Sequence, residues 1–216
     1  TGHGGTLDST ASGLLILLIA GATRLSDFVM QMTKTYHAVF RLGAETSTCD
    51  YAGEPLADYD WRHLSEADLD HLVPAFLGWR MQVPPKISAV HVNGRRAHEL
   101  ARRGEDPDIK PRPVFIERME RLSEISADGE VAYRIVCGKG TYVRSIARDF
   151  GRLLCCGAHI AALRRERIGP FDVKEGLYFE EDAAADEVAL RSSLLSITRM
   201  DDFLPSYALS EDDSVR

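Results

Sequence analysis

The alternation of apolar and polar residues predicts three β-strands in the chain. Between Thr35 and Leu42 every second side chain is apolar, which is typical of a strand with one face turned toward a core. Residues 114–122 and 130–137 have a similar character and predict two further strands. The apolar face of the first strand holds Tyr36, Ala38, Phe40 and Leu42, and its other face holds His37, Val39 and Arg41.

Other stretches have the patterns and end signals of helices. The longest apolar run, from Leu14 to Ala22, predicts a buried helix that ends near Gly21. Ser65 and Asp68 match a capping box, and Thr141 is a suitable N-cap residue. Helices are therefore expected over residues 14–21, 26–32, 65–76, 97–104, 141–155 and 187–196.

These strands and helices interleave without a regular βα period, which favours an α+β fold with a mixed sheet. The length of 216 residues suits one domain, or one domain with a small appendage. Residues 82–104 interrupt the pattern, because Pro84 and Pro85 prevent a long helix there. This segment is rich in arginine and predicts an insertion that presents positive charge.

The net charge of −7 argues against a nucleic-acid partner, but the charge is unevenly distributed along the chain. Residues 172–216 hold twelve acidic and four basic side chains, so the rest of the chain is close to neutral. Residues 86–112 and 137–168 carry local excesses of three and five positive charges. Such clusters fit a phosphate-binding surface, although they also fit solvated helix faces.

Several classes of protein do not fit the sequence. No apolar run reaches the roughly 18 residues that a membrane span requires. The four cysteines show no C-x-x-C pair and no zinc-site spacing, so we expect free thiols in the cytoplasm and no metal. No secretory signal is visible, but the chain begins at Thr1 without a methionine, so we expect a longer native chain.

Three side chains are candidates for chemistry, and each has a simpler explanation. Asp8 follows a glycine-rich loop, where it fits either a catalytic carboxylate or a helix cap. Arg144 is expected in the first turn of a helix, where the dipole disfavours a cation. It therefore fits a partner for a carboxylate, or a solvated side chain. Tyr36 opens a strand, where it fits a stacking surface for an unpaired base, or a core residue.

Taken in order, these stretches resemble the TruB-type tRNA pseudouridine synthases. The loop G-H-G-G-T-L-D-S-T-A-S-G is similar to the aspartate loop of that family, and K-G-T-Y-V-R is similar to its arginine motif. The resemblance covers about residues 1–175. Its six motifs are residues 2–13, 34–36 with 42–43, 46–53, 82–94, 139–144 and 157–165.

The resemblance implies roles for individual residues. Asp8 is expected to be the catalytic aspartate that attacks the target nucleoside, at either its base or its ribose. Arg144 is expected to pair with Asp8, Tyr36 to stack on the target base, and Leu163 to pack in the pocket. RNA contacts are expected from His3, Lys34, Lys86, Arg95, Arg96, Arg102, Arg103, Lys139, Tyr142, Arg148 and Arg152.

It also implies a fold, a substrate and an organisation. We expect the pseudouridine synthase fold, with a largely antiparallel sheet, flanking helices and an RNA-gripping loop at 82–104. The expected reaction converts uridine 55 in the T-loop of tRNA to pseudouridine, by a monomer without a cofactor. We expect a catalytic domain over residues 1–180, lacking an N-terminal strand segment of the family. Residues 181–216 are expected to form an acidic extension without a complete PUA domain.

Two residues depart from the pattern of the family, and three alternative functions remain open. Gly4 and Ser9 stand where the family usually has Thr and Pro, and both are expected to loosen the loop. One rival is a catalytically weakened family member that acts mainly as a tRNA-folding chaperone. The others are a guide-dependent RNA-modification subunit, which needs a PUA domain, and a glycosidase-like enzyme, which needs a second carboxylate.

Overall fold

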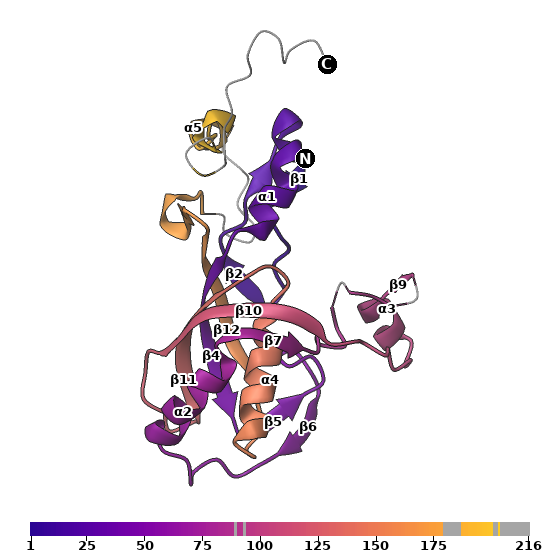
Figure 1. Cartoon of the computed structure of the whole chain (residues 1–216), viewed down its shortest axis with the longest axis vertical. Helices are drawn as coiled ribbons and strands as arrows, with labels where there is room; N and C mark the ends of the chain where they lie inside the picture. The colour runs from indigo at the N-terminus through magenta and orange to yellow at the C-terminus, as the bar shows by residue number, and fades with distance from the viewer. Residues whose placement is uncertain (89, 93, 179–186, 201–202, 204–216) are drawn as a thin grey trace.

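The computed structural model describes residues 1–88, 90–92, 94–178, 187–200 and 203. Its centre is a sheet with the strand order β13-β12-β4-β11-β10-β7, in which every pair along the path is antiparallel. A further strand, β2, pairs in parallel with β12, so the sheet is mixed (Figure 1). The strands are β2 (Ala11–Gly13), β4 (Lys34–Leu42), β7 (Gly78–Gln82), β10 (Arg112–Arg121), β11 (Glu130–Cys137), β12 (Ala158–Ile168) and β13 (Phe171–Asp172). The expected α+β fold is confirmed.

One face of this sheet carries the main core. Ala38, Phe40 and Leu42 are buried there, as the alternation in β4 predicts. Two helical elements pack on the same face, namely α4 (Val143–Leu153) and α2 (Glu66–Leu72) with the 3₁₀ turn η2 (Val73–Phe76). The rings of Phe40, Tyr133, Phe76 and Phe150 meet in this core, with centroids 4.8–5.8 Å apart.

The predicted helix over residues 14–21 is wrong. After β2 the chain remains extended and forms β3 (Leu17–Leu18), which pairs with β1 (Gly2–His3), before the 3₁₀ turn η1 (Ala20–Leu25). Its backbone bonds go to distant segments, since the amide of Leu14 donates to the carbonyl of Arg165 and that of Gly4 donates to Ile16. These tertiary bonds override the local preference of an apolar run. Asp8 therefore caps no helix.

The remaining predicted helices are close to the observed ones. The Ser65–Asp68 capping box is present, and α1 (Ser26–Gln31), α3 (Ala97–Arg102) and α5 (Glu187–Ser192) lie within their predicted ranges. Thr141, however, is not the N-cap of α4; Tyr142 occupies that position without a side-chain cap. The amide of Thr141 instead donates to Gly138 in the turn after β11, so the helix begins later.

Strand β12 was not predicted, although it lies inside the sheet. It carries four arginines or glutamates, and its register shifts between Ile160 and Ala162 and again between Arg165 and Arg167. These irregularities break the period-two pattern on which strand prediction depends. Short elements complete the fold: the hairpin β5 (Ala44–Thr46) and β6 (Pro55–Asp58), and the 3₁₀ turns η3 (Val173–Glu175) and η4 (Ile197–Met200).

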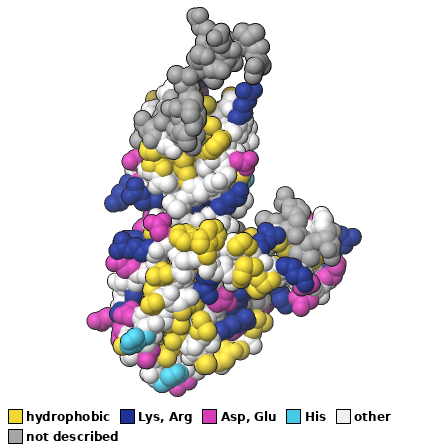
Figure 2. Space-filling view, in the orientation of Figure 1, with side chains coloured by type: hydrophobic (Ala, Val, Ile, Leu, Met, Phe, Trp, Pro, Cys, Tyr) yellow, Lys and Arg dark blue, Asp and Glu magenta, His cyan; other side chains and the backbone are white. Residues whose placement is uncertain are grey.

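The chain between β7 and β10 forms an arm that projects from the sheet (Figure 1). It contains the small hairpin β8 (His91–Val92) and β9 (Arg95–Arg96), followed by α3. Val90, Ala97 and Ile109 form a small core in the arm, and this core packs against Tyr142. The N-terminal elements β1, β3, η1 and α1 form a small lobe, called the N-terminal lobe below. Basic side chains are visible on the arm and around the junction between the sheet and this lobe (Figure 2).

Three further observations bear on the expectations. Among the described residues, no helix is both long enough and apolar enough to cross a membrane. All four cysteines are free thiols, as predicted. The expected domain boundary at residue 180 and most of the acidic extension lie outside the described residues.

Candidate active site

A cavity of about 290 Å³ lies where the N-terminal lobe meets the sheet. Its walls come from the loop that carries Asp8, the start of β4, the turn between β11 and α4, and the middle of β12. These segments are far apart in the sequence and meet only because β4 lies between β11 and β12. Among the predicted site residues, the cavity is lined by His3, Asp8, Lys34, Tyr36, Lys139, Tyr142 and Leu163.

Arg144 holds Asp8 by two hydrogen bonds at the edge of this cavity. Its Nε donates to Oδ2 and its Nη2 donates to Oδ1, both at 2.8 Å. The arginine side chain is 5% exposed and that of Asp8 is 37% exposed. A paired fork of this kind fixes both the position and the orientation of a carboxylate. The contact expected between these two residues is therefore present.

A second carboxylate, from Asp50, lies on the other side of Arg144. Its Oδ2 is 3.6 Å from Nη1 of the arginine, which also donates to the backbone carbonyl of Thr48 at 2.9 Å. Asp50 is buried, and it accepts hydrogen bonds from Thr48 Oγ1, Thr10 Oγ1 and the amide of Ala52. Arg144 thus has acceptors around its whole guanidinium. These contacts explain how a cation is tolerated in the first turn of α4.

Asp50 was assigned no role from the sequence, although its surroundings contain a signal. It is the aspartate of the T-x-T-x-D-x-x-G stretch, in which Thr48 Oγ1 donates to its carboxylate and Thr46 Oγ1 donates to its backbone carbonyl. A cluster of small hydroxyl residues around one carboxylate is a motif that can bury that carboxylate. The bond from Thr10 also ties this cluster to the aspartate loop, two residues after Asp8.

Arg165 also holds the aspartate loop, and sequence reasoning assigned it no role. Its guanidinium donates to the carbonyls of Leu14, Thr6 and Gly5 at 2.8, 2.9 and 3.2 Å. The residue is 1% exposed, in a strand position that faces the core. An arginine buried in a sheet needs such partners, because an unpaired buried charge is strongly destabilising.

Gly4 packs closely, which the expectation of a loosened loop did not foresee. A Cβ atom at this position would lie 2.5 Å from Cγ1 of Val29, so a larger residue requires a shift of α1. Gly4 is buried, and its amide donates to the carbonyl of Ile16. The glycine therefore permits a close approach between the loop and α1. Ser9 is exposed, and nothing in the structure explains its replacement of proline.

Tyr36 and Leu163 form apolar walls of the cavity. Burial raises the pKa of Tyr36 to about 12, with a smaller opposing effect from Arg165. The phenol is therefore in its protonated form at neutral pH and can act as a hydrogen-bond or proton donor. Its flat ring also offers a surface on which a nucleobase could stack.

Lys34, a predicted RNA contact, is almost fully buried beside this tyrosine. Its ammonium donates to the carbonyls of Met30, Met32 and Val29, at the end of helix α1. Burial, followed by repulsion from Arg165, lowers the pKa of Lys34 to about 8. The structure therefore gives Lys34 a role in holding α1, and any contact with RNA would compete with these bonds.

The other predicted RNA contacts fall into two groups. Arg148 donates to Asp149 and to the carbonyl of Val83, and Arg152 forms a fork with Glu45, so both already have partners within the protein. Lys86 lies on the arm in an ion pair with Asp106. Arg95 and Arg103 are exposed on the arm, and the side chains of Arg96 and Arg102 lie outside the described part of the structure.

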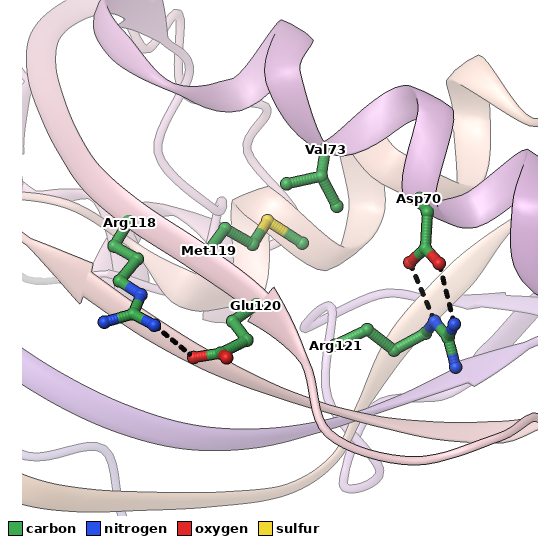
Figure 3. A pocket seen from close by; sticks show the side chains of 6 residues that line it. All are labelled: Asp70, Val73, Arg118, Met119, Glu120 and Arg121. Carbon is green, nitrogen blue, oxygen red and sulfur yellow. Dashed lines mark hydrogen bonds and ion pairs between the residues drawn. The ribbon is translucent and has the colours of Figure 1, made fainter.

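A second cavity, of about 400 Å³, lies between α2 and β10 (Figure 3). Its charged side chains pair with one another. Arg121 donates two hydrogen bonds to the carboxylate of Asp70. Nη2 of Arg118 lies 3.0 Å from Oε2 of Glu120. None of the residues that line it lines the Asp8 cavity. Among the described residues, no group of three or more His, Cys, Asp or Glu side chains could hold a metal ion. The Asp8 cavity is therefore the candidate active site.

Comparison with known families agrees with this geometry. Residues 1–143 match the TruB family pseudouridylate synthase N-terminal domain, which defines the class as a pseudouridylate synthase domain. Residues 144–200 match the tRNA pseudouridylate synthase B C-terminal domain. The chain belongs to the TruB family.

Individual relatives give the extent of the similarity. The chain is 44% identical to tRNA pseudouridine synthase B of Cereibacter sphaeroides, over 90% of this chain and 63% of the relative. It is 42% identical to the same-named protein of Rhodopseudomonas palustris, over 100% of this chain and 60% of the relative. The chain thus spans somewhat less than two thirds of the length of these relatives.

A solved structure has a similar fold. The match to a chain of a Cbf5-Nop10-Gar1 complex has a TM-score of 0.57 at 29% identity. It covers 79% of this chain and 41% of the other.

Proposed function

We propose that this protein isomerises uridine to pseudouridine in tRNA, at position 55 of the T-loop, with Asp8 as the nucleophile. The proposal rests on one contact, the fork between Arg144 and Asp8 at the edge of an aromatic-walled cavity. Membership of the TruB family supports the reaction and the tRNA substrate.

The cavity suits a flipped uracil. Removing the target uridine from its stack costs a few kcal/mol, and stacking on the ring of Tyr36 returns about 1–3 kcal/mol. Asp8 then attacks the base or the ribose, and the bond between C1′ and N1 breaks. The base turns and C5 bonds to C1′. The bond to Asp8 breaks, which restores its carboxylate, and the proton on C5 leaves. N1 gains a proton, so the reaction is an isomerisation that needs no redox partner, metal or other cofactor.

Arg144 and Tyr36 have distinct roles in this scheme. Arg144 keeps the Asp8 carboxylate in one orientation, so the attack needs no reorganisation of the site. The protonated phenol of Tyr36 is available for the later proton transfer at the base. Leu163 completes the apolar wall and helps to exclude water.

RNA binding is assigned to the rim of the cavity and to the arm. His3, Lys139 and Tyr142 line the cavity, and the arm carries Lys86, Arg95, Arg96, Arg102 and Arg103. Phosphate contacts from these cations give binding that weakens steeply with salt. We further propose that the protein acts as a monomer in the cytoplasm. The catalytic domain is assigned to residues 1–180 and the acidic extension to residues 181–216.

A tritium-release assay tests the function. A T-arm stem-loop labelled at carbon 5 of its uridines should release one tritium per RNA when the chain is present. A matched stem-loop with cytidine at the target position should release none. No release from the first RNA, under conditions in which it binds, would contradict the proposal and favour the chaperone alternative. That alternative is not favoured now, since the Asp8–Arg144 pair is intact.

A further inference from the structure

Gln82 joins the start of the arm to helix α4, which carries Arg144. It is the last residue of β7, it is 2% exposed, and its amide forms two bonds with the backbone of Tyr142. Its Nε2 donates to the carbonyl of Tyr142 at 3.1 Å, and its Oε1 accepts from the amide of Tyr142 at 2.9 Å. Tyr142 is the N-cap residue of α4, two positions before Arg144.

The next residue along the chain strengthens this junction. The carbonyl of Val83 accepts hydrogen bonds from Ser145 Oγ at 2.8 Å and from Arg148 Nη2 at 2.9 Å. Residues 82 and 83 are thus bonded to α4 on both sides of Arg144. The arm begins immediately afterwards, at the buried Pro84 and Pro85.

The local structure of α4 explains why this support matters. The helix has no side-chain cap at its N-terminus, and its second residue is a buried arginine that the dipole disfavours. Tyr142 also forms part of the cavity wall. An error of about 1 Å in a catalytic group can reduce a rate on the order of 100-fold.

We propose that Gln82 is a positioning residue for the reaction. By holding the backbone of Tyr142, it sets the start of α4 and so the placement of Arg144 against Asp8. It acts through Tyr142 and touches neither the reacting atoms nor the RNA phosphates. The arm and the catalytic arginine thereby share one anchored junction. The kinetic part of this inference rests on the proposed function.

The variant Gln82→Met removes both bonds while keeping a side chain of similar length. We expect kcat for pseudouridine formation, at saturating RNA, to fall by roughly tenfold or more. KM for RNA should stay within about twofold, because the phosphate contacts are unchanged. The control is Met81→Thr, since Met81 is the neighbouring residue of β7 and is 62% exposed. Its kcat should match that of the unsubstituted chain.

A milder variant covers the case in which Gln82→Met does not fold. Gln82→Asn withdraws the amide by about 1.5 Å, the length of one carbon–carbon bond, so it cannot make both bonds. It should lower kcat in the same direction and by a smaller factor. An unchanged kcat in either folded variant overturns the proposal. An equal loss in Met81→Thr also overturns it, because the effect would then belong to the strand.

Hydrogen exchange separates this inference from the proposed function. The amide of Tyr142 should exchange slowly in the unsubstituted chain, because it is bonded to Gln82. In Gln82→Met and Gln82→Asn it should exchange at least about tenfold faster, while the amides of β11 keep their protection. If Tyr142 exchanges equally in all variants, the junction does not exist, whether or not the chain makes pseudouridine. If the junction is present but the unsubstituted chain is inactive, only the proposed function fails.

Discussion

Arg144 and Asp8 are 136 residues apart in the sequence, yet each carboxylate oxygen of Asp8 accepts one hydrogen bond from Arg144. Neither residue is placed by its own local structure alone. Asp8 sits in a loop held by Arg165, and Arg144 sits in a helix whose start is bonded to Gln82. The geometry of the pair therefore depends on β12 and β7, at opposite sides of the sheet.

Replacing Arg144 by lysine should separate the effect of its positive charge from the effect of its two hydrogen bonds to Asp8. The variant Arg144→Lys keeps a cation but loses the planar fork, so Asp8 is no longer held by two bonds. We expect the single-turnover rate to fall on the order of 100-fold, with the Kd for RNA within about twofold. Arg164→Lys, at an exposed position of β12, is the matched control and should leave the rate unchanged.

Asp8→Asn should abolish pseudouridine formation and leave tRNA binding nearly intact. Asparagine keeps the size of the side chain but lacks the nucleophilic carboxylate. The tritium-release assay and a filter-binding assay measure the two properties on the same RNA. The control Asp58→Asn changes an exposed carboxylate of β6. Pseudouridine made by the Asp8 variant would show that another group is the nucleophile.

The arm should contribute to binding through its charge. Exchanging both Arg95 and Arg103 for alanine removes two exposed cations from the arm. If both arginines contact phosphates, the plot of log association constant against log salt concentration should become less steep by about 1.5. Affinities measured at a series of salt concentrations give this slope. The control is Arg62→Ala, an exposed position between β6 and α2 and outside the arm. A slope equal to that of the control would remove the arm from the RNA interface.

Gly4→Thr restores the residue that the family usually has, and it should destabilise this chain. The new Cβ would lie 2.5 Å from Val29 Cγ1, so we expect a loss of about 1–3 kcal/mol in the free energy of unfolding. Combining it with Val29→Ala should cost less than the sum of the two single changes, because the smaller side chain makes room. Urea unfolding of the four proteins measures this coupling. Strict additivity would contradict the predicted clash.

Lys34 should make stability depend on pH in the alkaline range. Its pKa is lowered from the ordinary lysine value of 10.5 to about 8 in the folded chain, so between these values the unfolded state binds more protons. Stability therefore rises with pH across this window, and the cost of burying the charge is fully present below the folded-state pKa. The unfolding free energy of the unsubstituted chain, relative to that of Lys34→Met, should rise as the pH increases through this window. A constant difference would contradict the shifted pKa.

Patterns that depend on near neighbours were predictable from the sequence. The alternation in residues 35–42 predicted β4, and the Ser65–Asp68 capping box predicted α2, because both signals act within a few residues. The aspartate, the tyrosine and the arginine of the proposed site were chosen from ordered motifs. Their assignment did not require knowledge of where the strands pair.

The features that sequence reasoning missed all depend on distant partners. Residues 14–18 look helical in isolation, but their backbone bonds to β12 and β1. Arg165 and Asp50 look like surface charges in isolation, but each is buried among acceptors or donors from other segments. The sequence by itself determined which residues are the candidates for the proposed chemistry, since side-chain type is local. Only the tertiary structure decided how they are held, because hydrogen bonds that span most of the chain form only after the sheet has assembled.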